Sequence, residues 1–222
     1  RLDFISSLPV DLFGFSLDGN FSVLRITHLV RIGLLDTYIA ELQDHLVEGR
    51  DLHLSTGDIS IGKNGFYILV IFHFIAVGFG SGLIRIAPGT WGSTVALILF
   101  IVAEAFIDDF LHLFFFITSL IIIFLISCIV ASRDADIKDD SRIVSDEMGG
   151  MLLTLFLVSI VSDEIFGYFV GFALFRAFDI VKPWPISYVD QNLKNGFGVF
   201  LDDLIAGFLS FLVFICFYLL LT

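Results

Sequence analysis

The stretch Leu111–Ala131, "LHLFFFITSLIIIFLISCIVA", contains no Asp, Glu, Lys or Arg, and neither does "LIAGFLSFLVFICFYLLLT" (Leu204–Thr222) at the end of the chain. A helix needs roughly 20 consecutive apolar residues to cross the hydrocarbon core of a bilayer. Both stretches reach about that length. They therefore predict helices that span a membrane and make the chain an integral membrane protein.

The composition of the whole chain agrees with this prediction. The 222 residues are 57% hydrophobic and include 27 Phe, and the mean hydropathy is +0.96. Only 16% of the residues are charged, whereas a soluble domain has about 25%. The formal net charge of −12 argues against nucleic-acid binding, which requires basic patches.

Apolar segments alternate with compact polar ones from Phe66 onward, which predicts an all-α bundle of several membrane helices. We expect two parts, an N-terminal accessory region (1–65) and a membrane domain (66–222). The turns at 107–110 and 162–164 are short enough to join antiparallel neighbours. The predicted helices cover residues 66–77, 92–107, 111–131, 148–161, 165–178 and 203–221.

Following these helices across the membrane gathers the polar segments 78–91, 132–147 and 179–202 on one face. Basic residues lie on that face and not in the opposite turns, which by the positive-inside rule predicts that this face is cytoplasmic. The segments 148–161 and 165–178 are short for full spans. They are either a re-entrant hairpin or a tilted pair shielded by neighbouring helices.

Acidic side chains stand where these polar segments meet apolar helices. Asp146 and Glu147 begin an apolar segment, where a carboxylate is costly unless it is paired, hydrated or bound to a cation. Simple alternatives exist, because acids also suit a helix N-terminus and Asp179 could pair with Lys182. Together, however, the acids offer hard oxygen ligands that suit Mg²⁺. The acids of this set are Asp139, Asp146, Glu147, Asp179, Asp202 and Asp203.

A glycine-rich segment, "GFGSGLIRIAPGTWGS" (78–93), precedes the predicted helix at 92–107. Small residues before a helix leave backbone N–H groups free to bind phosphate. The same glycines could instead allow close packing of membrane helices.

Four motifs occur in the order GFGSGL…APGTxGS, D…IVxDExxGM, FRxFDIxKPWPI and GxGxxxDDxxAG. In this order they resemble the phosphatidylglycerophosphatase A family over about residues 70 to 215. The chain departs from the usual family pattern at Ile84-Arg85, Ser145 and Asn195-Gly196. The resemblance implies a small all-helical enzyme that removes the terminal phosphate of phosphatidylglycerophosphate with Mg²⁺, giving phosphatidylglycerol.

The resemblance also carries roles onto matching positions. The expected catalytic residues are Asp139, Asp146, Glu147, Asp179, Lys182, Asp202 and Asp203. Those expected to hold the metal are Asp146, Glu147, Asp179, Asp202 and Asp203. Those expected to bind the phospholipid substrate are Gly80, Ser81, Gly82, Pro88, Gly89, Thr90 and Lys182.

Other interpretations of the sequence stay open. Residues 1–35 weakly resemble the third and fourth helices of a voltage-gated or cyclic-nucleotide-gated channel sensor. A cation transporter or channel would place acids at mid-membrane depth, and a non-catalytic lipid-binding protein would need no metal. For an enzyme, the nucleophile is either a water molecule or an aspartate, and the sequence makes no prediction of the oligomeric state.

Overall fold

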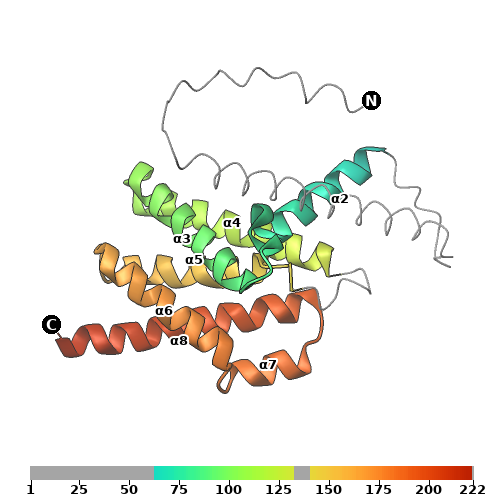
Figure 1. The fold of residues 1–222 in the computed structure, drawn as a ribbon. Coiled ribbons are helices and arrows are strands. Elements are labelled where there is room, and N and C mark those ends of the chain that lie inside the picture. The colour runs from blue at the N-terminus through green and yellow to red at the C-terminus, as the bar shows by residue number, and fades with distance from the viewer. Residues whose placement is uncertain (1–62, 133–140, 222) are drawn as a thin grey trace, which may run out of the picture. The chain divides into compact units, whose positions relative to one another are not determined.

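The computed structural model describes residues 63–132 and 141–221, and all regular structure within them is helical. This confirms the predicted all-α fold. Six longer α-helices, one 3-10 helix and one short α-helix make up this part of the chain (Figure 1). Their bounds are α2 Lys63–Ala76, η1 Gly78–Leu83, α3 Pro88–Phe106, α4 Phe110–Ala131, α5 Ser145–Ser159, α6 Ile165–Val181, α7 Ile186–Asn192 and α8 Gly196–Leu221.

Local chemistry explains several helix ends. Pro88 occupies the first turn of α3, where its missing N–H costs nothing and its fixed φ suits a helix. The Asp109 carboxylate caps α4 by accepting a hydrogen bond from the backbone N–H of His112 at 2.9 Å, as N-cap acids do. Lys182 ends α6 in the left-handed conformation, with φ 43, and Pro183 follows it.

The start predicted for the last helix was wrong. Helix α8 begins at Gly196 rather than at residue 203, so Asp202 and Asp203 lie in its second turn. The prediction placed residues 179–202 in a polar segment, but Gly196 already packs against a neighbouring helix. A Cβ at Gly196 would lie 2.9 Å from the backbone Cα of Ile129 on α4.

Helix α5 lies at the centre of the bundle and packs against α3, α4, α6 and α8 (Figure 1). Met148, Met151, Leu152 and Leu155 on it are completely buried. Its 15 residues extend only about 22 Å at 1.5 Å per residue, less than the thickness of the hydrocarbon core. The structure thus favours shielding by neighbours as the explanation for this short apolar helix.

Glycines bring the backbones of α5 and α8 into direct contact. A Cβ at Gly150 would lie 2.5 Å from the carbonyl oxygen of Asp203, and a Cβ at Gly207 would lie 2.5 Å from the carbonyl oxygen of Gly150. Small residues at helix interfaces allow this close approach in membrane proteins. The contact fixes Asp203 beside the first turns of α5.

Three helices in the described part of the chain are long and apolar enough to cross a membrane, namely α3, α4 and most of α8. Large apolar side chains such as Phe115, Phe166 and Leu220 are exposed on the bundle surface. An aqueous protein would not expose so many, so these features support a membrane protein. The N-terminal residues 1–62, including the channel-like segment, lie outside the described residues.

Candidate metal and phosphate site

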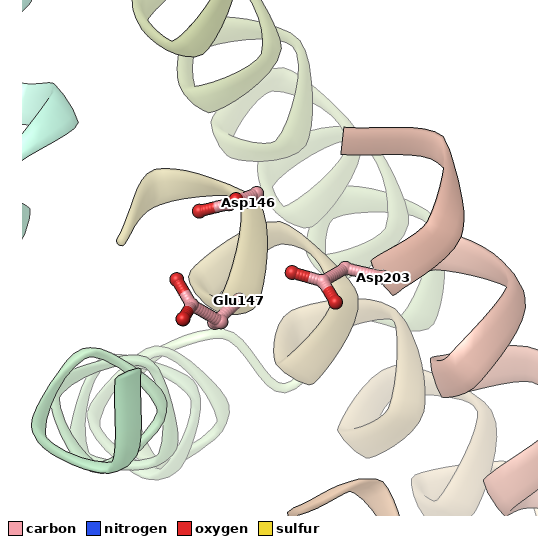
Figure 2. A group of neighbouring side chains, drawn as sticks. All are labelled: Asp146, Glu147 and Asp203. Carbon is pink, nitrogen blue, oxygen red and sulfur yellow. The ribbon is translucent and has the colours of Figure 1, made fainter. Parts of the chain in front are cut away.

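Three carboxylates meet between α5 and α8. Asp146 and Glu147 come from the first turn of α5, and Asp203 comes from the second turn of α8. One carboxylate oxygen from each residue lies within 4.8 Å of the other two. Figure 2 shows Asp203 extending from its helix toward the two acids of α5. We call these three residues the acid cluster.

The acid cluster is largely buried, with Glu147 partly exposed, and two of its oxygens have no hydrogen-bond partner among the described residues. Asp146 is 7% exposed and Asp203 is 3% exposed. Within the described residues, Asp146 Oδ1 and Glu147 Oε2 are buried without a hydrogen-bond partner. Burial raises the pKa of Asp146, and burial together with the Asp146 charge raises the pKa of Glu147. These costs are removed if a cation binds the free lone pairs, and an all-oxygen donor set fits Mg²⁺.

Asp179 lies near the acid cluster but has its own cationic partner. Its Oδ2 accepts a hydrogen bond from Arg176 Nη1 at 2.6 Å, and both side chains are mostly buried. The suggested ion pair between Asp179 and Lys182 was therefore wrong. Arg176 lies one turn earlier on the same helix face as Asp179, whereas Lys182 lies beyond the helix end.

Lys182 instead joins Asp202 and Asp190. Its Nζ donates hydrogen bonds to Asp202 Oδ2 at 2.5 Å and to Asp190 Oδ1 at 2.7 Å. Burial lowers the pKa of Lys182, but the two carboxylates outweigh burial and the net pKa is raised. Lys182 is therefore a fixed cation at the edge of the site. The second Asp202 oxygen, Oδ1, is buried without a partner among the described residues.

The predicted metal residues thus divide into two groups. Asp146, Glu147 and Asp203 form the acid cluster, whereas Asp179 and Asp202 are in ion pairs with Arg176 and Lys182. With Asp190, the partner of Lys182, six carboxyl groups face two cations in this region, so full ionisation would leave a net charge of −4. A divalent cation would neutralise half of it. The remaining predicted catalytic residue, Asp139, lies outside the described residues.

The glycine-rich segment forms the η1 turn and allows close packing against a neighbouring segment. The backbone N–H groups of Gly80 and Gly82 donate to the carbonyl oxygen of Val77 at 3.1 and 3.0 Å, so they stabilise the η1 turn. A Cβ at Gly82 would collide with the carbonyl oxygen of Arg142, which favours the packing explanation there. Ser81 Oγ is buried and has no hydrogen-bond partner among the described residues.

Gly89 has a different environment, directly at the acid cluster. A Cβ there would collide with Glu147 Oε1 and would lie 3.2 Å from Arg176 Nη2. Gly89 follows Pro88 in the first turn of α3, so the N-terminus of α3 faces these two side chains. The next amide, that of Thr90, already donates to the carbonyl oxygen of Ala87 at 3.0 Å.

The sequence alone did not single out Arg176 or Asp190 as part of the site. The position of Arg176, three residues before Asp179 on a helix, was the available signal. Asp190 lies on α7, a helix that hydrophobic patterning did not predict. It also lines a pocket of about 370 Å³, whose other lining residues are Ser132, Leu193, Lys194, Asn195, Gly196 and Val199.

Comparisons with known proteins agree with the resemblance seen in the motifs. The family model described as phosphatidylglycerophosphatase A matches residues 74–218. Phosphatidylglycerophosphatase A of Haemophilus influenzae is 40% identical over 144 residues, which cover 64% of this chain and 85% of that protein. The Escherichia coli protein of the same name is 35% identical over 139 residues, covering 63% of this chain and 78% of the relative.

A Bacteroides thetaiotaomicron protein with the provisional name phosphatidylinositol-3-phosphatase is 39% identical over 143 residues. These residues cover 63% of this chain and 88% of that relative. No solved structure matches this chain significantly.

Proposed function

The chain belongs to the phosphatidylglycerophosphatase A family, and on that basis we propose that it removes the terminal phosphate of phosphatidylglycerophosphate to give phosphatidylglycerol. The observation that carries this proposal for the chain itself is the acid cluster. Three carboxylates, two of them on buried residues and one on a partly buried residue, converge within 4.8 Å at one end of a bundle in which three helices are apolar enough to span a bilayer. Such a site can hold a cation next to a lipid headgroup.

We further propose that Mg²⁺ binds at Asp146, Glu147 and Asp203. When bound, Mg²⁺ supplies a Lewis acid that polarises a phosphoryl oxygen and lowers the pKa of water. The unpartnered oxygens Asp146 Oδ1 and Glu147 Oε2 support this assignment. Asp179 and Asp202, also predicted to hold metal, would orient the two neighbouring cations from their present ion pairs.

The other residues would bind and orient the headgroup. Lys182 presents a permanent positive charge that neutralises developing charge on the transferring phosphoryl group. The pocket beside its partner Asp190 has hydroxyl, amide and carboxylate groups that suit the glycerol of the headgroup. Gly80, Ser81, Gly82, Pro88, Gly89 and Thr90 remain the proposed substrate-binding segment, with Gly89 in the most direct position.

The nucleophile is either a water molecule, with Asp139 as a candidate base, or an aspartate that forms a covalent intermediate. The apolar faces of the bundle would keep the acyl chains in the bilayer while the headgroup reaches the acids. We propose that the site faces the cytoplasm, as the distribution of basic residues indicates, and that the membrane is the bacterial inner membrane.

The test is release of inorganic phosphate from phosphatidylglycerophosphate in detergent micelles, with Mg²⁺ and then with excess EDTA. Phosphatidylinositol-3-phosphate should be assayed in parallel, because the Bacteroides relative carries that name. We expect Asp146→Asn and Asp203→Asn to abolish release in folded protein. Asp163→Asn, an exposed acid in the turn before α6, is the matched control and should retain activity.

The same assay separates the competing functions. Equal activity with Mg²⁺ and EDTA would remove the metal site from the proposal. A folded wild-type protein that releases phosphate from neither lipid would contradict the phosphatase function. In that case, Mg²⁺ flux into proteoliposomes would support a transporter or channel, and its absence a non-catalytic lipid-binding protein.

A further inference from the structure

The guanidinium group of Arg176 is held from one side only. Its Nη1 donates to Asp179 Oδ2 at 2.6 Å and to Ser93 Oγ at 3.3 Å. Ser93 Oγ in turn donates to the carbonyl oxygen of Gly89 at 2.9 Å. The arginine side chain is 15% exposed. These contacts fix the guanidinium between α6 and the first turn of α3.

The opposite edge of the same guanidinium has no hydrogen-bond partner among the described residues. A guanidinium is planar, and its Nε–H and one Nη2–H point in parallel along one edge, as a fork that matches two oxygens of a carboxylate or phosphate. Nε is buried without a partner, and the bonds of Arg176 all use Nη1. A buried charged donor without an acceptor is costly, so this edge is suited to a ligand.

The free edge lies beside the acid cluster. Arg176 Nη2 is 3.2 Å from the position that a Cβ of Gly89 would occupy, and the carboxyl carbon of Glu147 is 3.0 Å from the same position. Because Gly89 has no side chain, Glu147 Oε1 can lie 2.2 Å from the position of the missing Cβ, which brings the arginine edge and the acid cluster together beside the first turn of α3. One phosphoryl group bound next to both side chains could contact a cation at the cluster and the arginine.

We propose that the Nε–Nη2 edge of Arg176 binds two oxygens of the phosphoryl group that is transferred. This inference rests on the proposed phosphatase function and adds a substrate-binding residue to it. Asp179 and Ser93 then act as positioning residues, because they hold the guanidinium through Nη1 and leave its other edge available. A purely structural arginine would need only the ion pair with Asp179, which a lysine could also make.

Arg176→Lys is the discriminating variant, because lysine keeps the charge and the reach toward Asp179 but has no fork. We expect kcat/KM for phosphate release to fall about 100-fold, the usual effect of losing one oriented donor to a developing oxyanion. Inhibition by inorganic phosphate should weaken about tenfold. Mg²⁺ binding, titrated with the metal alone, should change by less than about twofold. Asp163→Asn, in the exposed turn before α6 and outside the site, is the control and should leave all three values unchanged.

The outcomes are distinct. Wild-type inhibition by phosphate and wild-type kcat/KM in folded Arg176→Lys would overturn this inference while leaving the phosphatase proposal intact. No phosphate release by the wild-type protein would instead contradict the proposed function. If Arg176→Lys does not fold, Ser93→Ala provides the test, because it loosens the guanidinium and keeps its charge. We expect at least about fivefold weaker phosphate inhibition in Ser93→Ala, and unchanged inhibition would overturn the inference.

Discussion

Replacing Gly89 by alanine should separate the stability of the fold from the geometry of the site. Gly89 lies in the first turn of α3 and its φ is outside the left-handed region, so alanine can adopt its backbone conformation. Alanine also favours a helix over glycine by roughly 1 kcal/mol. The only obstacle is the space that the new methyl group would enter, next to the Glu147 carboxylate and Arg176.

The structure gives the size of the disturbance. The new Cβ would lie 2.2 Å from Glu147 Oε1, whereas non-bonded carbon and oxygen atoms approach to about 3.3 Å. The carboxylate must therefore move by about 1 Å. Mg²⁺ requires near-ideal octahedral geometry, and a misplacement of about 1 Å at a reacting centre can cost about 100-fold in rate. We expect kcat/KM to fall by about 10- to 100-fold.

The measurement is phosphate release from phosphatidylglycerophosphate in detergent across a Mg²⁺ titration, together with thermal unfolding. Gly89→Ala should need more Mg²⁺ for half-maximal activity and should melt at or above the wild-type temperature. Gly167→Ala is the matched control, because its Cβ would meet no atom closer than 3.3 Å. Wild-type activity and Mg²⁺ dependence in Gly89→Ala would refute the placement of Glu147 at the metal.

Three further predictions concern stability in detergent. Lys182→Met should lower the free energy of unfolding by roughly 3 kcal/mol, because it leaves the Asp202 carboxylate, whose side chain is only 2% exposed, without its cation. The double variant with Asp202→Asn should recover part of this loss. Additive effects in the double variant would contradict the ion pair. Gly207→Ala should lower the free energy of unfolding by about 1–3 kcal/mol and weaken Mg²⁺ binding, because its Cβ would lie 2.5 Å from a backbone carbonyl oxygen of α5. An unfolding free energy equal to that of the wild type would contradict the close contact between these helices. Burial raises the pKa of the Asp146 and Glu147 carboxyl groups. Without metal, the folded protein therefore loses stability as the pH rises and these groups ionise. Mg²⁺ binding, in contrast, requires the ionised carboxylates. The increase in melting temperature caused by Mg²⁺ over EDTA should therefore grow between about pH 5.5 and 8, and a constant increase would contradict the site.

Much of the fold follows from local properties of the chain. The apolar stretch at 111–131 is long enough to span a bilayer, and helix α4 occupies residues 110–131 as that length requires. The end of α6 was less predictable, because Lys182 closes it in a left-handed conformation. The start of α8 was missed, because residues up to 202 were assigned to a polar segment, whereas the helix begins at Gly196, which allows close packing against α4.

In the candidate site, too, the sequence predicted some features and tertiary packing decided others. The sequence identified the acids, because a carboxylate beside an apolar helix requires a partner wherever it lies. It could not pair them correctly, since Asp179 has Arg176 as its partner and Lys182 has Asp202. These pairs depend on helix register and on where each helix ends, which distant packing contacts decide.

By itself, therefore, the sequence determined a helical membrane protein, its family, and the residue types able to bind a metal and a phosphate. Hydrophobic length and the cost of buried charge act locally, so they can be recognised without coordinates. Only the tertiary structure decided that Asp146, Glu147 and Asp203 converge and that Arg176 keeps one edge free. Those arrangements arise where the glycines of α3, α5 and α8 let helices approach within contact distance, and such contacts join residues far apart in the chain.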